Sequence, residues 1–150
     1  MNAAEGSRAD GRRPRLAWVV LFLALFEGGW LAFDGAHALL AGDYVTPSSG
    51  EYAGQLGPWS KLVRAVGLEP RSTLVMSIHL VLGGSWLLVA AAFAAGARRA
   101  WRGMVACAIA GLWYLPFGTL LGVLQLALLF RPSLRGAYSA PRSKSASHSA

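Results

Sequence analysis

The stretch that decides the fold of this chain is Leu16–Leu40, LAWVVLFLALFEGGWLAFDGAHALL. Its 25 residues predict a helix of about 37 Å, which is long enough to cross a bilayer with some tilt. Two carboxylates and a histidine, Glu27, Asp34 and His37, stand within it. Ionisable groups near the centre of a membrane cost roughly 2.5–3.5 kcal/mol each on insertion scales. The stretch therefore predicts a membrane helix whose polar groups are hidden against protein partners or water.

The composition of the whole chain favours the same class of protein. Of 150 residues, 55% are hydrophobic and only 14% are charged, and the mean hydropathy is +0.44. Soluble domains carry about 25% charged residues. The net charge of +7 arises from basic residues at the ends of apolar stretches, a pattern typical of membrane flanks rather than of nucleic-acid binding. We expect an integral membrane protein in contact with the lipid bilayer, and no nucleic-acid partner.

The pattern of apolar and polar segments predicts an all-α integral membrane four-helix bundle between two basic tails. Residues 1–15 and 131–150 are expected to be disordered and cytoplasmic, because both are polar and rich in Arg or Ser. The membrane domain is expected to cover residues 16–130, with helices at about 16–40, 72–96, 99–115 and 117–130. The outer loop 41–71 is expected to carry a surface helix at 59–67, where Trp59, Leu62, Val63 and Val66 form an apolar stripe.

Two alternatives to this topology remain open. The first helix has a basic start and an Ala36-His37-Ala38 end, so it could instead be a signal peptide. The uncharged segment Gly103–Phe130 is interrupted near Pro116, and it could be one helix with a kink at Pro116, giving three helices in total. We prefer a hairpin of two short helices, because basic residues on both sides of the segment favour a cell-membrane protein with both termini cytoplasmic.

The polar residues of the first helix are predicted to share one face. At 100° per residue, Glu27, Trp30, Asp34 and His37 fall within an arc of about 80°. Counting 1.5 Å per residue places Asp34 level with His79 of the second helix, so we expect these two side chains to pair. The stripe is the candidate ligand or proton site.

Small residues and one amide predict where helices pack. Gly118 and Gly122 form a GxxxG spacing, and Gly83 and Gly84 give the second helix a small surface, so all four are candidate packing positions. Gln125 is the only amide of the last helix and could reach Glu27 or a neighbouring backbone.

The sequence leaves three functions open. The first is a non-enzymatic structural or accessory protein that packs with itself or in a larger membrane complex, its polar stripe holding helices together. The second is a proton-coupled carrier or small-ligand-binding protein that uses Glu27, Asp34 and His79. The third is a redox subunit with haem held by His37 and His79. No motif of a soluble enzyme is present, and the lone Cys107 excludes a cysteine-rich metal site or a thiol pair. We therefore expect no metal and no catalytic residue.

The block WYLPFGTLLGVLQLALL at residues 113–129, followed by basic residues, resembles the closing hairpin of many small bacterial multi-pass membrane proteins of unknown function. In those proteins an aromatic residue or Asn precedes Leu-Pro-x-Gly-Thr and Leu-Gly. The resemblance implies four short helices and carries over no catalytic residue.

Overall fold

The computed structural model describes residues 15–139, and every regular element in that range is a helix. The expected tails at residues 1–14 and 140–150 lie outside the described residues. Across the described part the chain is all-α, with six helices in the order α1 (Arg15–Ala41), α2 (Trp59–Ala65), α3 (Thr73–Ala94), α4 (Ala100–Gly111), α5 (Phe117–Leu129) and α6 (Pro132–Ser139).

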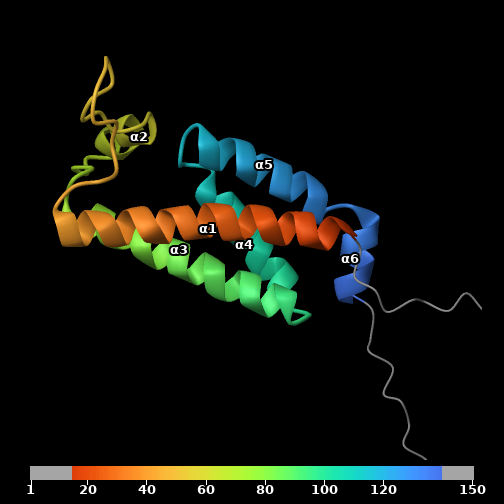
Figure 1. Ribbon diagram of the computed structural model, residues 1–150. Coiled ribbons are helices and arrows are strands. Elements are labelled where there is room, and N and C mark those ends of the chain that lie inside the picture. The colour runs from red at the N-terminus through yellow and green to blue at the C-terminus, as the bar shows by residue number, and fades with distance from the viewer. Residues whose placement is uncertain (1–14, 140–150) are drawn as a thin grey trace, which may run out of the picture.

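The two longest helices, α1 and α3, lie against each other and form the frame of the molecule (Figure 1). Glycines let their backbones touch. A Cβ atom added at Gly83 would collide with the backbone of Ala32 and lie 2.7 Å from the carbonyl oxygen of Gly28. One added at Gly35 would lie 2.5 Å from the amide nitrogen of Leu80. Gly84 faces open space and takes no part in this contact, although the sequence predicted it as a packing position.

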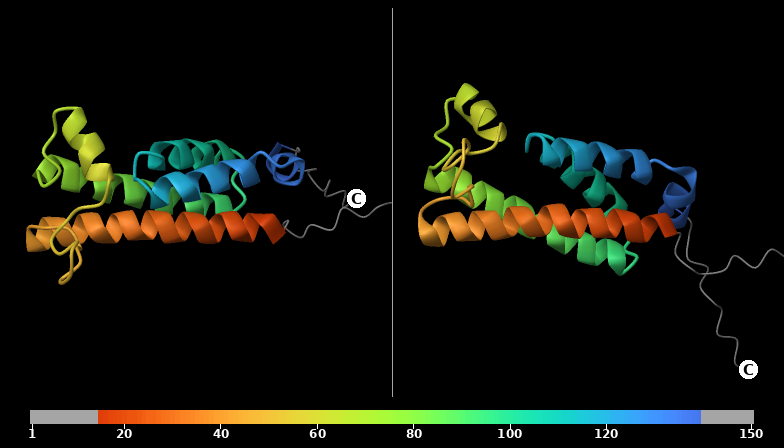
Figure 2. Two further views of the ribbon diagram at one scale, coloured as in Figure 1. Left: turned by 90° about the horizontal axis from the view of Figure 1, so that it is seen from above. Right: turned by 45° about the horizontal axis from the view of Figure 1, so that its top comes forward.

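Helices α4 and α5 form a hairpin on one side of this pair, rather than one kinked helix (Figure 2). Gly118 and Gly122 of α5 pack against α4, where added Cβ atoms would lie 2.5 Å from the Gly111 oxygen and 2.7 Å from the Ala108 oxygen. With 12 and 13 residues, these helices are only about 18 and 20 Å long. The turn between them therefore stops well short of the C-terminal end of α1.

The end of the bundle beyond that turn is covered by α2 and the loop before it. Arg71, at the start of α3, fastens the loop: its Nε donates to Asp43 Oδ1 at 2.8 Å, and its Nη2 donates to the Gly54 oxygen at 2.9 Å. Gly42 ends α1 with a positive φ of 83°, a conformation that favours glycine, so the chain can turn away from the helix axis there.

The opposite end is closed by α6, which lies where the sequence predicted a disordered tail from residue 131. Leu134 is fully buried, and the Tyr138 ring stacks on Phe93 at a centroid distance of 4.4 Å. The Tyr138 hydroxyl also donates to the Phe93 oxygen at 3.0 Å. Leu134 and Tyr138, one helical turn apart, hold this basic segment against the bundle. Its charged composition predicted a solvated tail instead of these two contacts.

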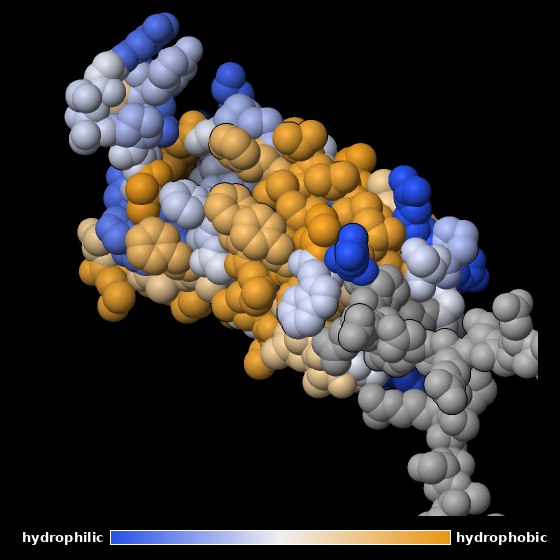
Figure 3. Space-filling model, turned by 45° about the vertical axis from the view of Figure 1, so that its right-hand side comes forward, coloured by the Kyte–Doolittle hydropathy of each residue, from blue (hydrophilic) through white to orange (hydrophobic). Residues whose placement is uncertain are grey.

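Helices α1 and α3 are each long and apolar enough to cross a membrane, with a mean hydropathy of 2.0 over the most apolar 18 residues. Only 33% of each such window is buried, whereas the core helix of a soluble protein buries most of its length. Figure 3 shows the consequence on one face, where hydrophobic residues cover the middle of the bundle and hydrophilic residues gather at the two ends.

Candidate functional site

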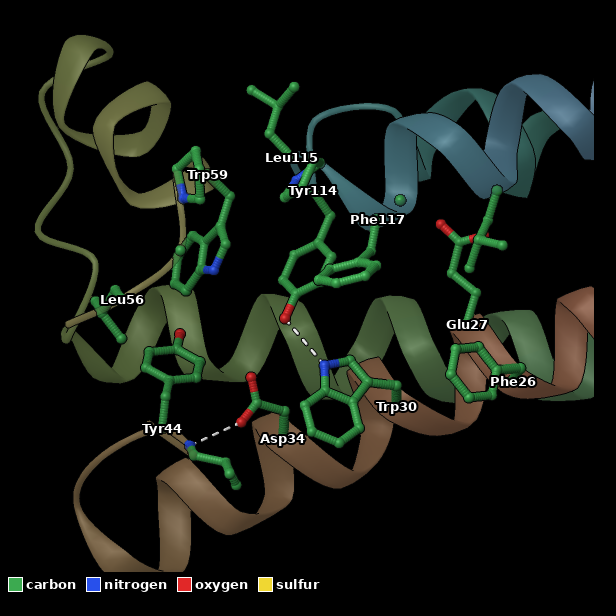
Figure 4. A pocket seen from close by; sticks show the side chains of 16 residues that line it. Phe26, Glu27, Trp30, Asp34, Tyr44, Leu56, Trp59, Tyr114, Leu115 and Phe117 are labelled. Carbon is green, nitrogen blue, oxygen red and sulfur yellow. Dashed lines mark hydrogen bonds between the residues drawn. The ribbon is translucent and has the colours of Figure 1, made fainter. Parts of the chain in front are cut away.

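The polar face of α1 lines a pocket of about 410 Å³ beneath α2 and its loop (Figure 4). Glu27, Trp30 and Asp34 all lie on its wall. The pocket occupies the space that the short α4–α5 hairpin leaves open above the C-terminal half of α1. Other lining residues come from the loop, from α2 and from the α4–α5 turn, among them Tyr44, Val45, Leu56, Trp59, Tyr114, Leu115 and Phe117.

Glu27 marks the inner end of the pocket and is only 3% exposed. Its Oε2 accepts a hydrogen bond of 2.9 Å from Nε2 of Gln125, which is itself fully buried on α5. This contact is one of the two that the sequence predicted for Gln125. The second carboxylate oxygen, Oε1, has no hydrogen-bond partner and lies beside Gly111 and Gly118, where the missing side chains leave it room.

Asp34 lies on the same face two helical turns further along and is also 3% exposed. Its Oδ1 accepts a 3.0 Å hydrogen bond from the backbone N–H of Val45. This bond pulls the start of the loop over the end of α1, so that Tyr44 and Val45 become part of the pocket wall.

The predicted pairing of Asp34 with His79 is wrong in its contacts, although the two residues do lie near each other. His79 Nδ1 is 2.9 Å from the carbonyl oxygen of Val75, one turn earlier in α3, and 3.3 Å from the Tyr44 hydroxyl. Because a carbonyl only accepts, the first contact places a proton on Nδ1. The other ring nitrogen, Nε2, is buried without a partner. Tyr44 reaches His79 from a loop whose path no helix periodicity predicts.

His79 is enclosed by aromatic rings rather than exposed to the pocket. The rings of Tyr44, Trp59, Trp113 and Tyr114 surround it at centroid distances of 5.0, 4.8, 5.1 and 5.8 Å. The free nitrogen of His79, Nε2, is buried within this packing. His37 is exposed, with Nδ1 3.1 Å from the Asp43 oxygen. Haem binding by these two histidines stays a prediction of the sequence.

The indole of Trp30 and the hydroxyl of Tyr114 connect α1 to the α4–α5 turn across the pocket. Trp30 Nε1 donates to the Tyr114 oxygen at 3.0 Å, between the Asp34 and Glu27 ends of the wall (Figure 4). The sequence placed Trp30 in the stripe but found no role for Tyr114. The sequence did not predict three residues that line the pocket: Tyr44, Val45 and Tyr114. The one signal that could have found the two tyrosines is the presence of aromatic residues beside the ends of the predicted helices.

The ionisable groups of Asp43, Arg71 and Tyr44, near the rim of the pocket, have shifted pKa values. The Arg71 guanidinium lowers the pKa of the Asp43 carboxyl, mainly through their hydrogen bond, and Asp43 in turn raises the pKa of Arg71. Burial raises the pKa of the Tyr44 phenol, so this group stays protonated at neutral pH. Among residues 15–139, no three His, Cys, Asp or Glu side chains are grouped as metal ligands would be.

Comparisons of the chain with protein-family models, with curated proteins and with solved structures found no match.

Proposed function

We propose that this chain is a small multi-pass protein of the cell membrane and that its pocket binds a small, largely apolar molecule at the depth of the outer leaflet. The observation that carries the proposal is that both buried carboxylates of α1 lie on the wall of one pocket of about 410 Å³. Pockets of roughly 300–1,000 Å³ are typical of small-molecule sites.

The membrane part of the proposal rests on the outer surface of the bundle. Large apolar side chains on all four central helices are more than half exposed, which in water is an aggregation hazard and in lipid is expected. They include Phe22, Phe33, Leu74, Val81, Leu88, Ile109, Phe117 and Leu120. In this proposal α1, α3, α4 and α5 are the four membrane helices, and the α4–α5 turn lies within the bilayer, shielded by α1 and by the pocket wall.

The orientation follows from the distribution of basic residues. Arg15, α6 and the α3–α4 connection lie at one end of the bundle (Figure 1), and that end carries Arg15, Arg98, Arg99, Arg102, Arg131 and Arg135. The loop end carries only Lys61, Arg64 and Arg71 among described residues. The positive-inside tendency places the first end, and with it both termini, in the cytoplasm. The pocket then lies in the outer half of the membrane.

The ligand reaches the pocket from the lipid side in this proposal. Phe26 and Phe117 line it and are 58% and 66% exposed, so its mouth joins the apolar surface of the bundle. A purely structural stripe would be dry and fully paired. The pocket beside Glu27, and the unpartnered Oε1 of that residue, favour ligand binding over an accessory role limited to packing.

The test is a thermal-unfolding titration of the purified full chain in detergent, with neopentylbenzene as a neutral apolar probe. A ligand that binds only the folded state raises the unfolding temperature. Val45→Trp adds an indole to the pocket wall and leaves the backbone N–H that bonds Asp34 in place. Leu88→Trp makes a comparable change on an exposed position of α3, outside the pocket.

We expect the probe to stabilise the wild type and Leu88→Trp equally and to have little effect on Val45→Trp. Equal stabilisation of all three proteins would mean that the probe acts through the detergent, and no stabilisation of any would mean that the pocket does not take an apolar molecule. Either result overturns the proposed function, and the accessory role with a protein partner or a second copy becomes the better proposal.

A further inference from the structure

The pocket contains two carboxyl groups and no basic side chain. Glu27 and Asp34 are both on its wall, and none of the 16 lining residues, all within the described range, is Lys, Arg or His. Across residues 15–139 the ion pair nearest these groups is Arg71–Asp43, at the rim, and no ion pair joins Asp34 to His37 or His79. Both carboxyl groups are nine-tenths or more buried, and among residues 15–139 no Lys or Arg side chain forms an ion pair with either of them.

Hydrogen bonding shows the same imbalance. Asp34 accepts from one backbone N–H, and Glu27 accepts from Gln125 through only one of its two oxygens. Glu27 Oε1 is buried with no donor. An incoming cation would be attracted to these oxygen acceptors, whereas an anionic group would be repelled by them in a weakly screened site.

The end of the pocket around Asp34 is aromatic. Figure 4 shows the Asp34 side chain rising from α1 between those of Tyr44 and Trp30, toward Trp59 and Tyr114. The Tyr44 and Trp59 rings are 5.1 Å apart between centroids, and Trp59 stacks with Tyr114 at 5.9 Å. Aromatic faces attract cations within about 6 Å of the ring centroid, and clusters of such rings bind quaternary ammonium groups.

From these observations we propose that the ligand of this pocket is an apolar organic cation, with its ammonium group beside Asp34 among the rings of Tyr44, Trp59 and Tyr114. Its apolar part extends along Phe117 toward the lipid-facing mouth. The inference rests on the proposed ligand-binding function and narrows it to one chemical class. Glu27, about 10.5 Å nearer the start of α1, adds the unpartnered acceptor Oε1 at the other end of the pocket.

The test compares three probes of nearly the same shape: benzyltrimethylammonium, its neutral carbon isostere neopentylbenzene, and the anion phenylmethanesulfonate. Dissociation constants are measured with the full chain in nanodiscs, and empty nanodiscs correct for partition into lipid. Asp34→Asn removes the charge and keeps an oxygen that can accept from Val45. Glu51→Gln removes one negative charge from an exposed position of the loop before α2 and serves as the matched control.

We expect benzyltrimethylammonium to bind at least about tenfold more tightly than neopentylbenzene, since the attraction between a cation and a nearby carboxylate in a weakly screened site is worth at least that factor. In Asp34→Asn the preference for the cation should fall about tenfold, while the affinity for neopentylbenzene stays unchanged and so shows that the pocket is still folded. Glu51→Gln should behave as the wild type.

Equal binding of the cation and its neutral isostere would overturn the cation proposal and leave the apolar pocket standing. Tighter binding of the sulfonate, or a cation preference that survives in Asp34→Asn, would also overturn it. If no probe binds, both the proposed function and the inference fail. If the cation and its neutral isostere bind equally, only the inference fails, so the two failures are distinguishable.

Discussion

Glu27 of α1 and Gln125 of α5 are joined by a 2.9 Å hydrogen bond in the interior of the bundle, although 98 positions separate them in the sequence. The bond fixes the α4–α5 hairpin at one height along α1. It thereby sets where the α4–α5 turn ends and where the pocket begins.

Replacing Gln125 by Leu should destabilise the protein, because Glu27 Oε2 then loses its donor while remaining buried. We expect a loss of about 1–2 kcal/mol, the range measured for interhelical hydrogen bonds in membranes and for buried groups left unsatisfied. Thermal unfolding followed by alkylation of the buried Cys107, the single thiol of the chain, measures it. Gln55→Leu is the control, since Gln55 makes its bond at an exposed position. Equal unfolding of both variants would contradict the role given to the Glu27–Gln125 bond.

Two adjacent glycines of α3 should differ sharply in their tolerance of a methyl group. Gly83→Ala places a Cβ atom against the backbone of Ala32, so α1 and α3 must move apart, at a cost of roughly 1–3 kcal/mol. Gly84→Ala meets nothing within 4 Å and should be neutral or slightly stabilising, because alanine favours the helix. Unfolding curves of the two variants under identical conditions decide the matter. Similar curves would mean that the close crossing of α1 and α3 does not exist as described.

The Arg71–Asp43 pair predicts a pH dependence confined to acid. Because Arg71 lowers the pKa of Asp43 below its ordinary value of 3.8, the pair stabilises the folded state above that pH. The stabilisation is lost as pH falls through the lower pKa of the folded state. Both groups are partly exposed, so the effect should be below about 1 kcal/mol and should weaken in high salt.

The measurement is the change in unfolding temperature between pH 6 and pH 3, followed by circular dichroism, for the wild type and for Arg71→Gln. The wild type should lose slightly more stability on acidification, because other carboxyl groups titrate equally in both proteins. An identical loss in the two proteins would show that the pair contributes nothing.

The proposed topology predicts which positions face the outside of the cell. With Cys107 replaced by Ser, a single Cys at Ser49 in the loop should react with a membrane-impermeant maleimide added to intact cells. A single Cys at Ser133, at the start of α6, should react only after the cells are opened. Both positions are exposed on the protein surface, so a difference reports the side of the membrane. Labelling of Ser133→Cys in intact cells would place the start of α6 outside the cell and would exclude a chain that crosses the membrane four times.

Regular periodicity made part of this fold and site readable from the sequence. The spacing of Glu27, Trp30, Asp34 and His37 predicted one polar face. The first three of these residues line one pocket, whereas His37 does not. Likewise, the position of Gln125 in an otherwise apolar helix pointed to Glu27. Both inferences depend only on the geometry of a single helix and on the cost of hiding polar groups from lipid.

The remaining features depend on chain segments without such a period. The pairing of Asp34 with His79 was mispredicted, because depth along a helix says nothing about a loop that inserts Tyr44 and Val45 between them. The helix α6 was missed, because two anchors, Leu134 and Tyr138, are too few to stand out in a basic segment. Tertiary contacts of loops and tails decide these cases.

The shortness of the α4–α5 hairpin divides the molecule into a fixed part and a variable part. The glycine crossing of α1 and α3 and the Glu27–Gln125 bond lie on the helices, whereas Leu56 and Trp59 reach the pocket from the covering segment. Substitutions in that segment change the shape of the binding space without disturbing the crossing or the bond. Under the proposed function, one scaffold of this kind acquires new ligand preferences through substitutions in α2 and the loop before it, while the glycine crossing and the Glu27–Gln125 bond stay the same.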